Sequence, residues 1–457
     1  MFKKTILGIG AGYVGGPTMA VIAKHCPEYK VIVTDINAEK IAAWQSSELP
    51  IYEPGLADIV KKTLGQNLFF TTDMKNSIRE ADIIFVSVNT PTKTFGEGAG
   101  KAANLEYWEK TARTILEVST SSKIIVEKST LPVRTAQAMA RILHSKDQKI
   151  HFEVLSNPEF LAEGTAISNM ENPDRVLIGG KNTEEGKNAV NELVKLYNQW
   201  VKTEKILTVE LWSAELSKLV ANAFLAQRIS SVNAISALCE KTEANITEIS
   251  RAVGMDSRIG DKFLNASIGF GGSCFKKDIL NLVYIAESYG LQEVADYWEQ
   301  VVKINEYQQK RFVLKMLRNM FNTVAGKKIA LFGFAFKANT GDTRESPAIS
   351  VAKQLLDEHA EIVITDPKAL DNARIDLKDC KGKISYEPDP VKATKGAHAI
   401  ALMTEWDEYK KLDYKKIFDL VEKPAFIFDG RNILNHKKLY EIGFNVYPTG
   451  LPKLTHF

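Results

Sequence analysis

The sequence contains little cysteine, and the cysteines it has are widely separated. They are Cys26, Cys239, Cys274 and Cys380. They form no CxxC pair and no Cys/His cluster, so we expect neither a disulfide framework nor a structural zinc site, and we predict that the protein binds no metal. The same pattern favours a reducing, cytoplasmic location.

A large net charge and a long apolar run are also absent. The formal charge is +3 on 59 basic and 56 acidic residues. No stretch reaches the roughly 18 apolar residues of a membrane-spanning helix. The start, "MFKKTILGIGAGYVGG", resembles a signal peptide, but five glycines between Gly8 and Gly16 disfavour a membrane-inserting helix. We therefore expect neither a membrane nor a nucleic acid as partner.

The N-terminal part of the chain alternates short β-branched runs with helical patterns. "KTILGI", "KVIVTD", "DIIFVSV" and "KIIVEKS" predict buried strands, and "NLEYWEKTARTILEVS" and "TEEGKNAVNELVKLYNQW" predict helices between them. This alternation is typical of parallel βαβ units, so a doubly wound sheet is expected. With 457 residues the chain is long enough for two or three domains.

The middle of the chain, from Glu210 to about Asn322, has a different pattern. Helical periodicity dominates, and strand signals disappear. "ELWSAELSKLVANAFLAQRISSVNAISALCEKT" contains more than 30 residues without Pro or Gly, which predicts one long helix joining two α/β blocks. Apolar helices of this kind often bury their surplus face against a second subunit, so we expect at least a dimer.

After "TVAGKK" the first pattern returns. "KKIALFGFAFKANT…EIVITDPKA" repeats the order of "KKTILGIGAGYVGG…KVIVTDINA": strand, glycine turn, helix, and a strand ending in aspartate. "HAIALMTEW", "AFIFDG" and "FNVYP" predict further strands. The sequence therefore predicts an α/β fold with two ligands. Two Rossmann-like parallel-sheet domains, 1–210 and 323–457, are joined by a helical central domain, 211–322, with a long connecting helix.

A dinucleotide-binding turn follows the first strand. Gly10, Gly12 and Gly15 form G-x-G-x-x-G before a helix, and Asp35 ends the next strand 20 residues after Gly15. The glycines serve a tight turn, a close approach to the pyrophosphate and close helix packing. Asp35 is expected to bind the adenine ribose and repel a 2′-phosphate, which favours NAD over NADP. Lys40, one helical turn away, is the residue that such a phosphate would recruit.

"GFGGSCFKKD" places Cys274 behind three glycines and before two lysines and Asp278. If a helix begins near Phe275, its N-terminus and the lysines favour a thiolate; the alternative is a buried structural thiol. Lys218 and Asn222, at i and i+4 on the middle helix, share either a catalytic face or a solvated one. A nicotinamide enzyme needs only a base to remove one hydride. A nucleophilic cysteine therefore implies a second oxidation, from aldehyde to acid, through a thiohemiacetal and a thioester.

Seven motifs then occur in the order of a known family: "GAGYVG", "SVNTPT", "EKSTLPVR", "NPEFLAEGTA", "SKLVANAFLAQRISSVNA", "GFGGSCFKKD" and "GFAFKANTGDTRES". Over nearly its whole length the chain resembles the UDP-glucose/GDP-mannose dehydrogenase family, and within it the UDP-glucose 6-dehydrogenases of the animal-type branch. The resemblance implies four-electron oxidation of UDP-glucose to UDP-glucuronate with reduction of two NAD⁺. It also implies a hexamer built as a trimer of dimers.

The family pattern assigns roles to the residues around the thiol. Cys274 matches the nucleophile that holds the aldehyde oxidation state, and Lys218 matches a residue that stabilises the oxyanion. Asn222 matches a residue that orients the sugar.

Proton transfer is assigned to three further residues by the same resemblance. Asp278, and Thr130 through a water, would assist it. Glu159 of "NPEF" would be the base in thioester hydrolysis, a task that suits a carboxylate with a raised pKa.

Two sets of binding residues follow from the resemblance. The cofactor set comprises Gly10, Ala11, Gly12, Tyr13, Val14, Gly15, Asp35, Lys40, Val88, Asn89, Thr90, Pro91, Thr92, Ser129, Thr130, Leu131, Glu163, Cys274, Lys277 and Arg344. The substrate set comprises Glu159, Phe160, Leu161, Ala162, Glu163, Lys218, Asn222, Arg258, Asn265, Ser267, Ile268, Gly269, Phe270, Gly271, Gly272, Phe336, Lys337 and Arg431. The loop glycines are expected to let backbone N–H groups approach the UDP diphosphate and the glucose. Arg258 would be donated across a dimer, or else form a surface salt bridge.

The sequence departs from the animal-type pattern in places. Asn265 stands where the pattern has Lys, which puts one substrate contact in doubt, and Lys40 stands where Arg is usual beside the adenosine. The chain ends soon after "YPTGLPKLTHF", without the long basic tail of some relatives; that tail is not expected to be catalytic.

Other functions share parts of these patterns. One is a two-electron 3-hydroxyacid or 6-phosphogluconate-like dehydrogenase, which needs neither the third domain nor the cysteine. Another is a nucleotide-sugar dehydrogenase of the GDP-mannose type. A third is a catalytically silent NAD-binding scaffold in which the helical connector merely dimerises.

Overall fold

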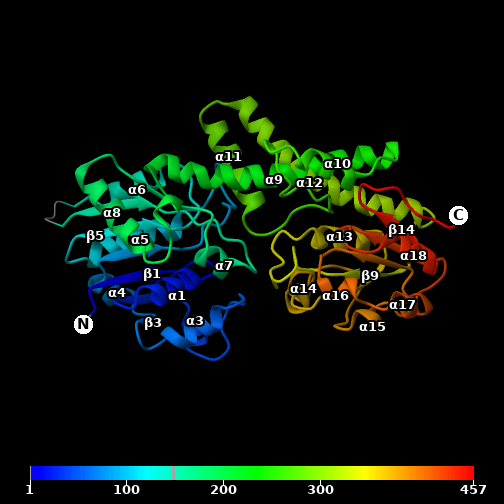
Figure 1. Cartoon of the computed structure of the whole chain (residues 1–457), viewed down its shortest axis with the longest axis horizontal. Coiled ribbons are helices and arrows are strands. Elements are labelled where there is room, and N and C mark those ends of the chain that lie inside the picture. The colour runs from blue at the N-terminus through cyan, green and yellow to red at the C-terminus, as the bar shows by residue number, and fades with distance from the viewer. Residues whose placement is uncertain (1, 147–149) are drawn as a thin grey trace. The chain divides into compact units, whose positions relative to one another are not determined.

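The computed structural model describes residues 2–146 and 150–457. The chain divides into two compact units. Unit 1 comprises Met1–Ala221 and Leu280–Tyr289, and unit 2 comprises Asn222–Ile279 and Gly290–Phe457. Figure 1 shows a sheet flanked by helices in each, coloured blue to cyan in unit 1 and yellow to red in unit 2.

Unit 1 contains an eight-stranded sheet within the described residues. Its strand order is β3-β2-β1-β4-β5-β6-β7-β8, and only the β6–β7 pair is antiparallel. The predicted strands before the first domain boundary are confirmed. The strands are β1 Lys4–Ile9, β2 Tyr29–Thr34, β3 Leu68–Thr71, β4 Ile83–Val86, β5 Lys123–Glu127, β6 Phe152–Ser156, β7 Val176–Gly180 and β8 Ile206–Glu210.

Helices cover both faces of this sheet. Alternation along β1 sends Ile6 to one apolar cluster, with α1, α3 and α8, and sends Leu7 and Ile9 to the other, with α5 and α6. Both helices predicted from the sequence, α5 and α8, are present. The helices are α1 Gly15–His25, α2 Ala38–Trp44, α3 Leu56–Thr63, α4 Met74–Glu80, α5 Glu106–Val118, α6 Thr135–Leu143, α7 Ala166–Glu171 and α8 Glu184–Tyr197, with a 3₁₀ turn at Thr203–Lys205.

Unit 2 contains a six-stranded, all-parallel sheet. Its order, β11-β10-β9-β12-β13-β14, matches the first six positions of the other sheet, so the predicted repeat of the N-terminal pattern is confirmed. The strands are β9 Lys328–Phe332, β10 Glu361–Thr365, β11 Lys383–Tyr386, β12 Ala399–Leu402, β13 Phe426–Asp429 and β14 Asn445–Pro448.

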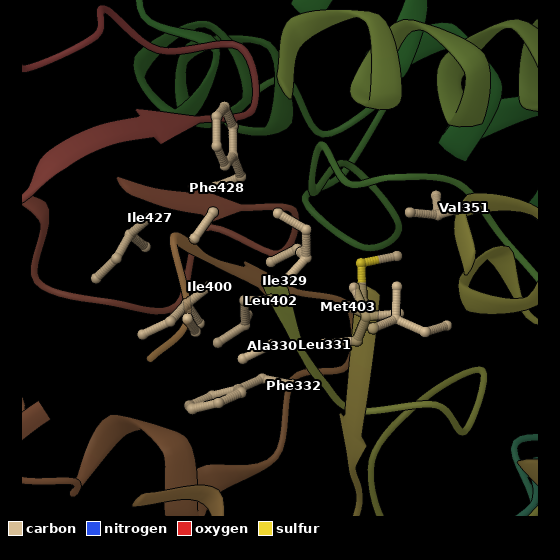
Figure 2. Packing of buried hydrophobic residues seen from close by; sticks show 14 of the residues in the cluster. Ile329, Ala330, Leu331, Phe332, Val351, Ile400, Leu402, Met403, Ile427 and Phe428 are labelled. Atoms are coloured by element: carbon tan, nitrogen blue, oxygen red, sulfur yellow. The ribbon is translucent and has the colours of Figure 1, made fainter. Parts of the chain in front are cut away.

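The core of unit 2 lies around its central strands. Figure 2 shows Ile329 and Leu331 of β9, Ile400 and Leu402 of β12 and Phe428 of β13 in this buried cluster. Its helices are α10 Ile246–Gly254, α12 Gln292–Asn319, α13 Pro347–Asp357, α14 Leu370–Asp376, α15 Pro390–Ala393, α16 Asp407–Lys410, α17 Tyr414–Leu420 and α18 His436–Ile442.

Two helices continue from one unit into the other. They are α9, Leu211–Thr242, and α11, Phe275–Ser288. The 32 residues of α9 confirm the predicted long helix. No helix among the described residues is long and apolar enough to cross a membrane.

Candidate active site

The glycine turn after β1 has the geometry that the motif predicts. Gly10 has φ +103°, and a Cβ there would lie 2.5 Å from the Ser87 carbonyl oxygen. A Cβ at Gly15 would lie 1.9 Å from the Gly10 carbonyl oxygen, so glycine lets α1 begin close to β1. A Cβ at Gly12 would meet no atom within 4 Å, which leaves its backbone open to a ligand. The turn therefore fits a diphosphate at the N-terminus of α1.

Asp35 follows the end of β2 and faces this turn. Its carboxylate accepts hydrogen bonds from the backbone N–H groups of Ala11 and Asn37, both at 3.0 Å, and from Lys40 Nζ at 3.0 Å. Burial acts to raise the Asp35 pKa, but these donors lower it below its ordinary value. The carboxylate is therefore charged, as an acceptor for a ribose diol must be, and Lys40 is bonded to it.

The loops after β4 and β5 lie together at the same edge of the sheet. Ser129 Oγ donates to the Val88 carbonyl oxygen at 2.7 Å, and Thr90 Oγ1 donates to the Thr130 carbonyl oxygen at 3.1 Å. In a doubly wound sheet, ligands bind at the carboxyl ends of the strands near the point where strand order reverses. The structure thus brings the two predicted cofactor loops together.

Glu159, in the loop after β6, forms an ion pair with Lys218 of α9 at 3.1 Å. Both side chains are buried, with 8% and 4% exposed, so a solvated helix face at Lys218 is excluded. Lys218 Nζ also lies 5.4 Å from the centre of the Phe160 ring. The loop itself is held by Glu53, which accepts from the N–H groups of Gly164 and Ala166 at 2.7 and 3.1 Å.

The expectation that the Glu159 pKa is raised is wrong. Burial does act to raise it, but Lys218, the Leu161 N–H at 2.6 Å and the charge of Lys128 lower the pKa below its ordinary value. Glu159 is therefore ionised at neutral pH before any substrate arrives.

Lys128, which directly follows β5, was not among the sequence-predicted residues. It is 7% exposed. Its ammonium donates to Asn157 Oδ1 at 3.0 Å and to Tyr197 Oη at 3.3 Å. The one signal in the sequence is a lysine that follows the apolar run 124–126 and Glu127, in "IIVEKS".

A buried acidic pair lies beside the same strand end. The Glu215 carboxylate accepts from the N–H groups of Arg134 and Ala136 at 2.7 Å each, at the start of α6. Burial and the neighbouring Glu215 raise the pKa of Glu127 well above its ordinary value. The raised pKa favours the protonated form of Glu127. Sequence analysis did not predict this pair.

In unit 2, Cys274 directly precedes α11, as the sequence predicted. The thiol is half-buried, and the Cys274 carbonyl oxygen accepts the Asp278 N–H at 2.8 Å. The Asp278 carboxylate accepts from Asn222 Nδ2 at 2.6 Å and lies 3.0 Å from Lys277 Nζ. Asn222 is buried, with 6% exposed, so it does not lie on a solvated helix face either.

The glycine loop before Cys274 is packed against other parts of unit 2. A Cβ at Gly269 would lie 2.6 Å from Asn305 Oδ1, one at Gly271 would lie 2.5 Å from the Glu345 carbonyl oxygen, and one at Gly272 would lie 3.0 Å from Phe336. These glycines are therefore required by packing within the unit, whatever ligand also approaches the loop.

The loop after β9 begins like the dinucleotide turn and then differs. Gly333 has φ +95°, close to the value at Gly10. Asp366, after β10, is only 2% exposed and accepts five N–H groups, from Phe334, Ala335, Lys368, Ala369 and Trp406. Because its hydrogen-bonding capacity is used within the protein, Asp366 does not offer a ribose site like Asp35.

The remaining predicted residues of unit 2 differ in accessibility. Arg431 is largely buried and donates to the carbonyl oxygens of Met403 and Phe336 at 2.7 and 2.9 Å. Arg344 is bound to Asp342 through contacts of 2.6 to 2.9 Å. Arg258 is exposed and pairs with Asp256 at 2.7 Å, which is the surface salt bridge that the sequence allowed as the alternative.

The predicted catalytic residues divide into two groups of three by the unit to which they belong. Thr130, Glu159 and Lys218 belong to unit 1, and Asn222, Cys274 and Asp278 belong to unit 2. Lys218 and Asn222 lie about one turn apart on the continuous helix α9. Among the described residues, no group of three or more His, Cys, Asp or Glu side chains is placed to hold a metal ion.

Three models of one family match the chain. For the UDP-glucose/GDP-mannose dehydrogenase family, the NAD binding domain matches residues 4–201, the central domain 212–307 and the UDP binding domain 330–436.

Known proteins resemble the chain over nearly its full length. UDP-glucose 6-dehydrogenase 4 of Arabidopsis thaliana is 61% identical, over 97% of this chain and 96% of its own. UDP-glucose 6-dehydrogenase 1 of Glycine max is 60% identical with the same coverage. The expected assignment to an animal-type branch is not supported, because these relatives are plant enzymes.

Two solved structures have the same fold. A UDP-glucose dehydrogenase from the hyperthermophilic archaeon Pyrobaculum islandicum matches with a TM-score of 0.87 and 30% identity, over 98% of this chain and 97% of that one. A UDP-D-ManNAc dehydrogenase from Pyrococcus horikoshii matches with a TM-score of 0.82 and 26% identity, over 98% and 99%.

Proposed function

Because the chain belongs to the UDP-glucose/GDP-mannose dehydrogenase family, we propose that it converts UDP-glucose to UDP-glucuronate through intermediates bound to Cys274. It is an NAD-dependent oxidoreductase that acts on UDP-glucose. The observation that carries the covalent route is the position of Cys274, half-buried and directly before the first turn of α11. A helix N-terminus stabilises a thiolate there.

The proposed reaction has three steps. The C6 alcohol first loses a hydride and a proton to become an aldehyde. The Cys274 thiolate adds to this aldehyde, and the resulting thiohemiacetal loses a second hydride to give a thioester. Water then cleaves the thioester to a carboxylate and the free thiol. In sum, UDP-glucose, two NAD⁺ and one water give UDP-glucuronate, two NADH and three protons.

The residues of the two groups have separate roles in this proposal. Lys218 stabilises the oxyanion at C6, and the ionised Glu159 activates the hydrolytic water. Asp278, and Thr130 through a water, carry protons, while Asn222 orients the sugar and fixes the Asp278 carboxylate.

NAD supplies a two-electron acceptor for each oxidation. The open space at Gly12 and the charged Asp35 support its binding at the β1–α1 turn. We assign the remaining cofactor and substrate residues as the resemblance implies them, and we keep the proposed domains 1–210, 211–322 and 323–457.

Self-association and location belong to the same proposal. We propose at least a dimer, with Arg258 reaching the partner's site, and a hexamer as a trimer of dimers. The exposed apolar residues of α9 and α12 support an interface. A cytoplasmic location is supported by the four cysteines, none of which forms a disulfide in the described residues.

The test is a panel of sugar nucleotides with NADH counted against substrate consumed. UDP-glucose is expected to yield two NADH per molecule, and GDP-mannose and UDP-N-acetyl sugars to react slowly. One NADH per UDP-glucose would identify a two-electron dehydrogenase, and none would leave a binding protein.

A further inference from the structure

Lys128 belongs to a buried, hydrogen-bonded polar network inside unit 1. Tyr197 Oη, on α8, donates to Asn157 Oδ1 at 2.6 Å, and Asn157 Nδ2 donates to the Leu177 carbonyl oxygen at 2.7 Å. These bonds fix the oxygen that accepts the Lys128 ammonium, so the cation is held in one place.

The network lies beside Glu159. Lys128, Asn157, Glu159 and Tyr197 all line one cavity of about 120 Å³. A cavity of this size has room for several waters, since one water needs roughly 10–15 Å³ by this measure. Glu159, the proposed hydrolytic base, and the buried Lys128 ammonium therefore line one space that is large enough for water.

We propose that Lys128 is a positioning residue for thioester hydrolysis, acting with Lys218 as the second of two cations that keep the Glu159 carboxylate charged. This role rests on the proposed function, because it requires Glu159 to be the hydrolytic base. A buried carboxylate facing one cation forms a neutral pair, whereas a second cation favours its ionised state even when Lys218 turns to the oxyanion of the substrate.

The surrounding groups are consistent with this charge balance. Burial lowers the pKa of Lys128 to about 8, against the opposing charge of Glu159, so the ammonium is charged through the neutral range. Burial raises the pKa of Tyr197, which is therefore neutral. Asp174 and Arg175 also line the cavity, and the Arg175 guanidinium lies over the Phe160 ring at 3.8 Å. The cavity residues of α1 are uncharged.

A purely structural lysine at the other end of β5 provides the matched control. Lys123, at the start of β5, is also buried, and it donates to the Ala81 carbonyl oxygen at 2.6 Å. Burial likewise lowers its pKa, but its charged neighbour is Asp82, and Glu159 is not among the groups that shift it. Each substitution removes one buried lysine charge at an end of β5, but only Lys128 is among the groups that lower the Glu159 pKa.

The experiment compares Lys128→Gln with Lys123→Gln in the full-length enzyme with UDP-glucose and NAD⁺. Glutamine keeps a donor for Asn157 and removes the charge. Losing a cation raises the Glu159 pKa, so the acid limb of the kcat profile is expected to move to higher pH. At any pH below the limb, kcat should fall about tenfold for each pH unit that the limb moves. At pH 6, intact-mass measurement is expected to detect the thioester on Cys274 in Lys128→Gln alone, with the Kd for UDP-glucose unchanged.

The outcomes separate this role from the proposed function. The role of Lys128 is overturned if the acid limb does not move in a Lys128→Gln enzyme that still yields two NADH per UDP-glucose. One NADH per UDP-glucose in the parent overturns the proposed function instead. If Lys128→Gln does not fold, Lys128→Met and Lys128→Arg are measured in its place. Lys128→Arg should keep the limb near its parental pH, and a limb that moves equally in both variants overturns the proposal.

Discussion

Cys274 combines half-burial with a position at the first turn of α11. If it carries the aldehyde and acyl intermediates, Cys274→Ser should lower kcat by at least about a thousandfold while leaving UDP-glucose binding nearly intact, because a serine hydroxyl is a far weaker nucleophile. The measurement is NADH release together with a UDP-glucose titration.

Cys380→Ser is the matched control for this variant. Cys380 is likewise a half-buried thiol of unit 2 outside any disulfide, and it belongs to no predicted site. Parental turnover by Cys274→Ser would rule out covalent catalysis.

At the residue scale, sequence analysis predicted chemical identity better than ionisation. The family resemblance named Glu159 and Lys218, which the structure places 3.1 Å apart, yet the Glu159 pKa was predicted in the wrong direction. That direction depends on Lys128 and Lys218 reaching Glu159 from a separate strand end and a separate helix. Lys128 was not predicted because a lysine that follows a strand usually lies in solvent, and its burial depends on contacts with distant parts of the chain.

At the element scale, alanine substitutions at two glycines of the β1–α1 turn should affect different properties, stability in one case and NAD affinity in the other. Gly15→Ala places a Cβ 1.9 Å from the Gly10 carbonyl oxygen, so it is expected to lower the free energy of unfolding by about 1–3 kcal/mol. Gly12→Ala enters open space, so the protein should keep its stability and lose NAD affinity by about tenfold or more. Thermal unfolding and NAD titration check both.

Equal loss of stability in the two variants would contradict this separation of roles. Gly65→Ala is a useful reference, because Gly65 has open space and a positive φ but lies outside the turn. It should show the cost of backbone strain alone, with NAD affinity unchanged.

Strands and helices were the most predictable elements. The β-branched runs around Ile6 and Ile329 became central strands, and the run without Pro or Gly became α9. The role of the loop glycines at 269–272 was harder to predict, because Asn305, Phe336 and Glu345 approach them from distant parts of the chain.

At the scale of the whole molecule, self-association should depend on the apolar side chains exposed on α9. Leu238 is 59% exposed, and other large apolar side chains of α9 are also exposed. Leu238→Glu is expected to reduce the sedimenting mass and, if Arg258 serves a partner's site, to reduce activity in parallel. Sedimentation velocity with activity measured across the same concentrations checks this.

Ile375→Glu provides the comparison, since Ile375 of α14 is 63% exposed and outside the proposed interface. A Leu238→Glu protein that sediments like both the parent and Ile375→Glu would exclude this part of α9 from the interface.

The five N–H groups bound to Asp366 prevent the second sheet from binding a dinucleotide as the first sheet is proposed to do. Gly333, Ala335 and Ala338 stand at the spacing of Gly10, Gly12 and Gly15, so two alanine-to-glycine changes would rewrite the fingerprint in the second sheet. The Asp366 carboxylate, however, already accepts its hydrogen bonds from within the protein. Introducing glycine at positions 335 and 338 would therefore create the sequence of a dinucleotide-binding motif without creating a site for the ribose.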